Sequence, residues 1–377
     1  ANDPSGIANI QINGLNAISS DDFAHWSIVV PLNPGLNTLP VTAIDNYGNR
    51  NDHSAQISIT SNPFLDAPTE LVLDSVNNRA LIVDSGSEAL VAVDLSTGVR
   101  SIVSDYSTSD AANELDSPSG LALDSANNRV LVVDHVLSAV VAVDLNTGAR
   151  NIISNDFIPD TMHALGGPTA LALDSANNRV LVVDAALDAL LEVDLSTGAR
   201  NLISDDNTPD TMHPMNNPTG IVLDSVNNRA LVVDSGSDAL LAVDLSTGVR
   251  SLISDDSIPG SFNGFYDPVA VVLDNANNRV LVAESRLDGV LAVDLSTGVH
   301  SIVSENSTPD AITAFDSPVG LALDSANNRV LVIDTGQRAL FSVDLNTGER
   351  EIISDNRYPD AMNSLDVPIG LALDSKN

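Results

Sequence analysis

The stretch from Pro168 to Ser204, PTALALDSANNRVLVVDAALDALLEVDLSTGARNLIS, predicts the fold of most of the chain. Close versions of it return along the sequence at a constant interval, with no insertion or deletion between them. Each version opens on a proline, at positions 68, 118, 168, 218, 268, 318 and 368. Because this period is 50 residues, it indicates an array of supersecondary units that pack against their neighbours.

One unit contains four short runs rich in apolar and β-branched residues, at 171–174, 179–184, 189–195 and 199–204. Turn-forming residues, Ser175-Ala-Asn-Asn178 and Ser196-Thr-Gly198, separate the first run from the second and the third from the fourth. Four short strands followed by a longer return loop are typical of a β-propeller blade. Helical repeats need a 3.6-residue apolar spacing that no segment shows, and leucine-rich repeats are roughly half as long. We therefore predict an all-β propeller of four-stranded blades, with six full repeats and the start of a seventh.

The repeat also resembles a known group. The pattern P-x-G-L-A-L-D, a strand ending in Asp, and V-D-L-x-T-G-x-R is similar to the NHL and YWTD propeller repeats of the TolB/SMP-30-like group. The resemblance covers residues 66–377. It implies a propeller fold, in a group that includes receptors, scaffolds and gluconolactonase-like enzymes. Those enzymes hold a metal at the channel mouth through acid and amide side chains from different blades.

Residues 1–62 differ from the repeats, with alternating apolar runs punctuated by Asn-Gly, Pro-Gly and Gly-Asn turn signals. They resemble the latter part of a bacterial Ig-like module, on Asn13-Gly14, Trp26, Val30-Pro-Leu32, Pro34-Gly-Leu-Asn37 and Asp45-Asn-Tyr-Gly-Asn49. We expect Trp26 to be a core residue of this partial β-sandwich.

We assign residues 63–67 to a linker and residues 68–377 to the propeller. Since the last repeat stops after one strand, we expect a chain cut at both ends, from a ring of at least seven blades. The alternative is a ring of six blades, in which the last strand is displaced.

The composition favours an exported protein. The chain carries 51 acidic and 16 basic residues, a net charge of −35, and no cysteine. Such a surface repels nucleic acid and anionic membranes and attracts cations. No run approaches the ~20 apolar residues of a membrane-spanning helix. We expect a soluble bacterial protein, extracellular or on the cell surface, with self-association through the Ig-like module left open.

Residues present in every repeat are expected to serve the blade. Three acidic positions recur: the series that begins with Asp74, the series that begins with Asp84 and includes Glu284, and the series that begins with Asp94. We expect each acid to cap its own turn by accepting backbone N–H groups. The recurring arginine after Asn-Asn, Arg79 to Arg329, is expected to pair with these acids.

Variation between repeats is confined to two kinds of loop. The turn between the second and third strands and the long loop between blades differ, and strand direction places both on one face of the ring. Diversified loops on a rigid scaffold are typical of recognition, and exposed aromatics and arginine are favoured in protein or sugar contacts. The candidate ligand-binding residues are His135, His163, His213, Phe262, Phe265, Tyr266, Arg286, Arg338 and Tyr358. The alternative is that Phe262 and Tyr266 fill gaps between blades.

Evidence for catalysis is slight. The chain lacks G-x-S-x-G, H-E-x-x-H, a P-loop and a cysteine nucleophile. Glu70, where other repeats have Gly or Ala, is the one irregular acid near the expected axis. Calcium binding by acidic clusters such as Asp205-Asp206 with Asp210 is left open. We predict a binding or adhesion scaffold for a protein or glycan, with a metal-dependent lactonase or polysaccharide lyase, or a subunit of a surface array, as alternatives.

Overall fold

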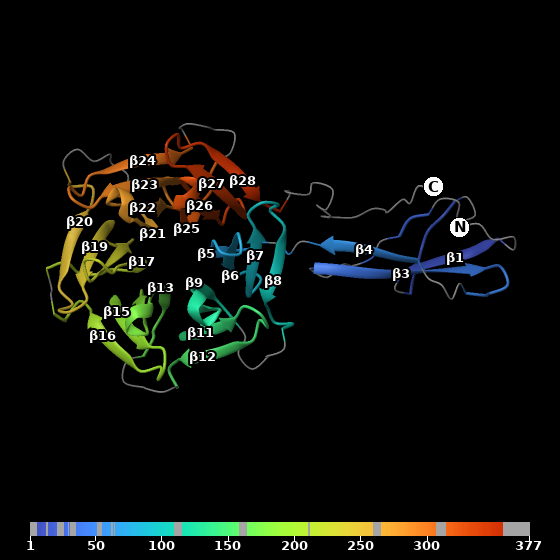
Figure 1. Cartoon of the computed structure of the whole chain (residues 1–377), viewed down its shortest axis with the longest axis horizontal. Coiled ribbons are helices and arrows are strands. Elements are labelled where there is room, and N and C mark those ends of the chain that lie inside the picture. Colours follow the sequence, from blue (N-terminus) through green and yellow to red (C-terminus); the bar gives the residue numbers. More distant parts are fainter. Residues whose placement is uncertain are drawn as a thin grey trace. The chain divides into compact units, whose positions relative to one another are not determined.

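The computed structural model describes residues 6–12, 14–20, 26–28, 30, 35–50, 55–61, 63, 65–108, 115–157, 164–209, 212–258, 265–306 and 314–356. The chain divides into two compact units, with a boundary after Pro63 (Figure 1). The described part contains no helix long and apolar enough to cross a membrane.

The N-terminal unit contains an antiparallel sheet in the order β2-β1-β3-β4. Its strands are β1 (Ile7–Ile12), β2 (Leu15–Asn16), β3 (Gly35–Asp45) and β4 (Ala55–Ser61). Ile10, Ile12 and Leu39 are buried, and Trp26 packs against them. Trp26 is thus half-buried against the core of this sheet, and the Ig-like assignment stays a prediction.

The second unit consists of six four-stranded antiparallel sheets, each from one continuous segment. Blades one to three are β5 (Pro68–Asp74), β6 (Arg79–Asp84), β7 (Ala89–Asp94), β8 (Arg100–Ser104); β9 (Pro118–Asp124), β10 (Arg129–Asp134), β11 (Ala139–Asp144), β12 (Arg150–Ser154); β13 (Pro168–Asp174), β14 (Arg179–Asp184), β15 (Ala189–Asp194) and β16 (Arg200–Ser204).

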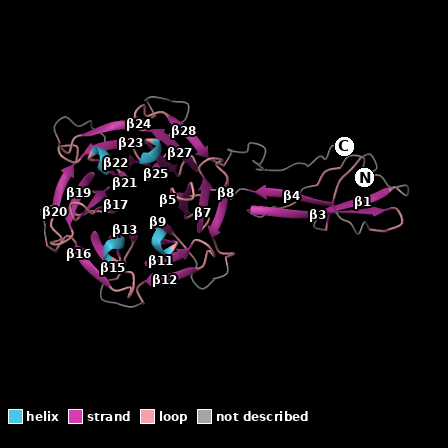
Figure 2. Ribbon diagram, in the orientation of Figure 1, coloured by secondary structure: helices cyan, strands magenta, loops and turns pink. Residues whose placement is uncertain are grey.

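Blades four to six are β17 (Pro218–Asp224), β18 (Arg229–Asp234), β19 (Ala239–Asp244), β20 (Arg250–Ser254); β21 (Pro268–Asp274), β22 (Arg279–Glu284), β23 (Gly289–Asp294), β24 (His300–Glu305); β25 (Pro318–Asp324), β26 (Arg329–Asp334), β27 (Ala339–Asp344) and β28 (Arg350–Ser354). Short 3-10 turns, drawn as helices in Figure 2, follow four of the first strands: η2 (Ser125–Asn127), η3 (Ser175–Asn177), η4 (Asn275–Asn277) and η5 (Ser325–Asn327).

The six blades close into a ring, with β25 packed against β5 (Figure 1). The junction of blades six and one repeats the bonds of the other junctions. Ser354 donates its hydroxyl to the Gly98 carbonyl at 2.9 Å, as Ser104 does to the Gly148 carbonyl at 2.7 Å. The expectation of at least seven blades is therefore wrong, because β5 already occupies the place beside β25 that a seventh blade needs. The predicted propeller fold is confirmed.

The hydrophobic core lies between neighbouring blades. At the junction of blades six and one, for example, Leu331 and Ile333 of β26 form one buried cluster with Leu71 and Ile82. The second strand of every blade is covered on both sides, and therefore its apolar residues run continuously instead of alternating. Each blade packs against a neighbouring blade on both of its faces. Small and branched aliphatic residues fill these contacts, and aromatic residues are rare in them.

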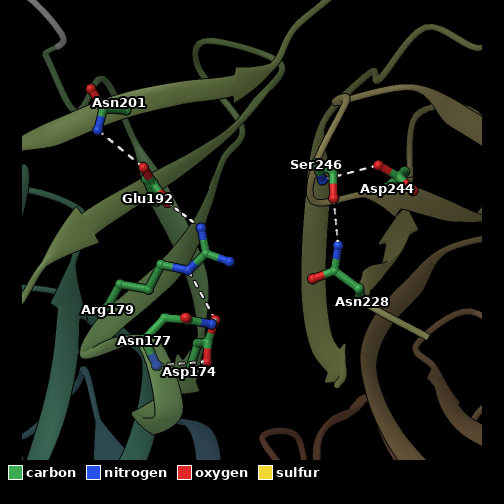
Figure 3. Close-up of polar contacts among 8 residues, drawn as sticks. All are labelled: Asp174, Asn177, Arg179, Glu192, Asn201, Asn228, Asp244 and Ser246. Carbon is green, nitrogen blue, oxygen red and sulfur yellow. Dashed lines mark hydrogen bonds and ion pairs between the residues drawn. The ribbon is translucent and has the colours of Figure 1, made fainter. Parts of the chain in front are cut away.

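The recurring acids hold turns, as predicted. Asp174 accepts hydrogen bonds from the Asn177 amide and from Arg179 Nε, and Arg179 also pairs with Glu192 (Figure 3). Burial raises the pKa of Asp174, but the bonds from Asn177 and Arg179 outweigh it, and the pKa lies below its usual value. In blade four, the Asn228 amide in the turn after the first strand donates to the Ser246 hydroxyl in the turn after the third strand. The Ser246 N–H in turn donates to Asp244 (Figure 3). The recurring arginines therefore pair with the acids, which confirms that prediction.

A second recurring arginine, to which the sequence analysis gave no role, joins the blades. Arg200 is buried, and its Nη1 donates to the Ser154 hydroxyl and the Asn155 carbonyl of the preceding blade. Arg100, Arg150, Arg250 and Arg350 also donate to carbonyl groups of the preceding blade. His300 takes this position in blade five, where its ring contacts the Ser254 hydroxyl.

Candidate functional site

The central channel and the face that carries the variable loops are the candidate ligand sites that the described part of the propeller offers to the sequence predictions. The channel encloses about 820 Å³ and is lined by the first strands of the blades. Most lining side chains are Leu, Val, Ala and Ile, and Glu70 contributes a carboxylate. Burial raises the pKa of Glu70 to about 8, against the opposing effect of the N–H groups of Leu71 and Leu321.

Glu70 belongs to the junction between the first and last blades. Its Oε1 accepts a hydrogen bond from the Leu71 N–H at 2.9 Å. A Cβ atom on Gly320, in β25, would lie 2.8 Å from the same oxygen. The glycine on the adjoining strand therefore leaves room for the Glu70 side chain, which lies as a contact between the first and last blades.

The channel does not assemble a metal site from the described residues. No group of three His, Asp or Glu side chains in the described ranges is arranged to hold a metal ion. Asp174 and Asp324, which also line the channel, already accept hydrogen bonds from their own turns.

The loops sort onto two faces, as the strand directions predicted. On the constant-turn face, the turns after the first and third strands meet, since Leu95 N–H donates to the Asn78 carbonyl. On the opposite face, the turn after the second strand meets the loop before the first, since Ser85 N–H donates to the Ala67 carbonyl. We call the second the variable-loop face; it consists of the turns between second and third strands and the loops between blades.

The second recurring acid anchors this face. Asp84 accepts the N–H groups of Asp66 and Ala67 as well as that of Ser87 in its own turn. The prediction that this acid caps only its own turn was thus incomplete. The aspartates of this series tie the variable turn of their blade to the loop that enters the blade, as Asp334 does through Gln337 and Asp316, whereas Glu284, among the described residues, accepts hydrogen bonds only from the entering loop.

The structure separates the candidate ligand-binding residues into groups. His135, Arg286 and Arg338 are exposed on the variable-loop face, Tyr266 is 41% exposed, and His213 is half-buried. The His213 carbonyl accepts a bond from Arg250 Nε. His163, Phe262 and Tyr358 lie outside the described residues.

Phe265 does not belong to the exposed group. It is fully buried and its ring lies 5.2 Å from the ring of His300. The equivalent positions of the other blades carry buried apolar residues as well: Leu65, Leu115, Leu165, Met215 and Phe315. The prediction that Phe265 contacts a ligand is therefore wrong, because this register position fills the gap between blades.

Arg338 contributes to ring closure. Its Nη1 lies 3.1 Å from Asp66, and both side chains are about half exposed. An exposed pair of this kind contributes at most about 1 kcal/mol. Thr335 reinforces the same junction by donating its hydroxyl to the Pro68 carbonyl. Two of the residues that break the repeat, Glu70 and Arg338, thus have a structural explanation at the junction of blades six and one.

Several apolar side chains that were not predicted from the sequence are exposed on the variable-loop face. Phe157 is 87% exposed, Met212 80% and Tyr106 71%. Together with Tyr266 and two exposed residues of the variable turns they form the loop-face apolar set: Tyr106, Val136, Phe157, Leu187, Met212 and Tyr266. Tyr106 was detectable, since the equivalent position of every other blade is Asp or Asn.

The second unit is thus a six-bladed β-propeller with one constant and one variable face. No protein-family model matches the chain, and no curated protein matches it. Solved structures share the fold. A chain in the crystal structure of a nidogen/laminin complex has a TM-score of 0.56 and 14% identity, covering 72% of this chain and 92% of its own length. A gluconolactonase from Xanthomonas campestris has a TM-score of 0.54 and 13% identity, covering 77% of this chain and 87% of its own.

Proposed function

We propose that this chain is an extracellular recognition scaffold that binds a protein partner through the variable-loop face of its propeller. The observation that carries the proposal is the contrast between the two faces. One is built from nearly invariant turns, whereas the other varies in every blade and carries the exposed aromatics of the described propeller. Exposed apolar groups on a soluble domain commonly mark interaction sites.

The chemistry of the face favours a protein over a glycan. Aromatic side chains can contact either a protein or a sugar. Val136, Leu187 and Met212 are not aromatic, and such side chains contribute little to sugar binding. The net charge of the chain is −35. Charge complementarity therefore favours a partner surface that combines apolar with basic side chains. The nidogen/laminin structure is consistent with a propeller that acts in a protein complex.

The fold likeness to a gluconolactonase supports hydrolysis as the second candidate. That reading places the chemistry at the channel, where Glu70 is the odd carboxylate. It is less favoured, since the described channel residues offer no set of metal ligands. Glucono-lactone with added calcium or zinc is the direct probe. Hydrolysis by the wild type that is lost in Glu70→Gln would replace our proposal with the enzyme.

Binding is tested by comparative capture with the immobilised full chain. A loop-face variant combines Tyr106→Ser, Phe157→Ser and Met212→Ser. A matched control combines Val76→Ser and Val226→Ser, which change exposed valines in turns of the constant-turn face. We expect at least one protein from the source organism to be retained by the wild type and the control and lost by the loop-face variant. Equal retention by all three chains would refute the proposal.

A further inference from the structure

Blade five contains the one glutamate in the second series of recurring acids, Glu284, which is fully buried. The aspartates at this position use two oxygens. In blade six, for example, Asp334 Oδ2 accepts the Asp316 N–H and Oδ1 accepts the Gln337 N–H. Glu284 is one methylene longer, and its Oε2 accepts both the Tyr266 and the Asp267 N–H groups. Its Oε1 is buried and has no hydrogen-bond partner among the described residues.

A second carboxylate loses its donor at the same place. Asp188 and Asp288, in variable turns, accept the N–H of a residue in the next blade: Asn217 at 2.8 Å and Ser317 at 3.0 Å. Asp238 holds the equivalent position in blade four, where the corresponding donor is the Asp267 N–H. Glu284 takes that donor at 3.0 Å. Asp238 Oδ1 is accordingly buried and has no partner within the described part of the chain.

The charges around these two oxygens are almost all negative. Burial raises the pKa of Glu284 to about 8, assisted by Asp267 and Asp238. Burial also raises the pKa of Asp238, assisted by Asp267 and Asp256, and Arg286 opposes that shift. Asp267 accepts the Ser285 hydroxyl, and Asp256 lies 3.8 Å from His300. No group of three His, Asp or Glu side chains in the described ranges is arranged to hold a metal ion, and a calcium ion needs more oxygen ligands than two carboxylates supply.

We propose that Glu284 and Asp238 share a single proton in the folded chain at neutral pH, and that its loss loosens the variable-loop face between blades four and five. One proton satisfies both oxygens, because the protonated carboxyl donates and the other accepts. Without it, the buried Glu284 and the half-buried Asp238 both carry a negative charge near Asp267. Their repulsion acts on the turn that carries Asp238 and on the segment that carries Tyr266. The consequence for partner binding rests on the proposed function, while the proton site itself does not.

Glutamate-selective ¹³C labelling and NMR titration test the proton directly. The chain has eight glutamates, and Glu284→Gln identifies the signal. We expect a Glu284 midpoint that is raised by several pH units, and a decrease of about one unit in Asp238→Asn, because a nearby negative charge is removed. The control is Asp188→Asn, which removes the carboxylate at the equivalent position of blade three, where the Asn217 N–H donates to it. This control should leave the Glu284 midpoint unchanged. A midpoint near the ordinary glutamate value, or equal shifts in both variants, would overturn the proposal, as would a titration abolished by added calcium alone.

Hydrogen–deuterium exchange tests the loosening. Wild type and Glu284→Gln are compared at the same pH, so that the intrinsic exchange rate cancels. Above the titration midpoint we expect faster exchange in wild-type peptides covering 235–238 and 265–268, and no difference at pH 6. Equal exchange at every pH would show that the proton does not control these loops. Since this readout needs no partner, its failure is distinct from a failure of the capture experiment.

Discussion

Asn356 closes the ring by binding Leu65, which lies 291 residues earlier in the chain. The Leu65 N–H donates to Asn356 Oδ1 at 3.2 Å, and Asn356 Nδ2 donates to the Leu65 carbonyl at 3.0 Å. Asn306 makes the same pair of bonds with Phe315, only nine residues onward. Between Asn306 and Phe315, this pair of bonds connects the two ends of one loop between blades. Between Asn356 and Leu65, the same pair of bonds connects the last blade to the first.

This relationship predicts a position-dependent cost of the same substitution. Asn356→Ala removes both bonds to Leu65 and a bond from Arg100 Nη1, which we expect to lower the free energy of unfolding by about 2 kcal/mol. Asn306→Ala is the control, because its loop stays covalently connected. Limited proteolysis and chemical denaturation measure the difference. If Asn306→Ala opened the propeller to protease as readily as Asn356→Ala, the closure role would be refuted.

The buried arginines between blades should be among the least replaceable residues. Arg200→Met leaves the Ser154 hydroxyl and the Asn155 carbonyl without their donor, with an expected loss of about 3 kcal/mol. His300→Arg should be tolerated, because in blade six Arg350 coexists with Phe315, its guanidinium 4.9 Å from the ring. Thermal unfolding measures both. A harmless Arg200→Met would contradict the role assigned to these arginines.

Glu70 predicts a pH dependence of stability. Burial raises its pKa from 4.5 to about 8, so the folded chain binds this proton more tightly than the unfolded chain does. Stability is therefore lost as pH rises between these two values. Glu70→Gln cannot titrate, and its melting temperature should match the wild type at pH 4.5 and exceed it at pH 9. A wild-type advantage at pH 9 would mean that the carboxylate is stabilised, for example by a bound cation.

Two phenylalanines on the same side of the ring should respond oppositely. Phe157 is exposed, and Phe157→Ser should change the stability by no more than about 0.5 kcal/mol while weakening partner binding. Phe265 is buried, and Phe265→Ala should cost about 3–5 kcal/mol. Chemical denaturation distinguishes them. Substantial destabilisation by Phe157→Ser would show that this side chain serves the fold.

Two of the ligand-binding residues predicted from the sequence, Arg286 and Tyr266, give a separate test of binding through the variable-loop face. Arg286 and Tyr266 are exposed on the variable-loop face, and alanine at either should reduce partner binding with little change in melting temperature. The comparison is made with Val226→Ala on the constant-turn face. Equal losses of binding and of melting temperature would assign Arg286 and Tyr266 to the fold instead.

The sequence predicted most of the fold because every blade repeats the same local chemistry. Strands, turns and the pairing of Arg79 with Asp74 follow from residue types and spacing. The number of blades did not follow, since the sequence repeats the first strand once more at Pro368, and only packing decides which copy lies beside β25. The burial of Phe265 was predictable, because its register carries apolar residues in every blade. The exposure of Phe157 was not, because it depends on how a variable loop leaves the blade.

The most direct measurement is site-specific photo-crosslinking from the two faces of the full chain. A photo-reactive phenylalanine analogue is placed at Phe157 in one variant and at Val226 in another, and each is mixed with proteins of the source organism. We predict a defined adduct from position 157 and none from position 226. An adduct from position 226, or none from position 157, would contradict recognition through the variable-loop face.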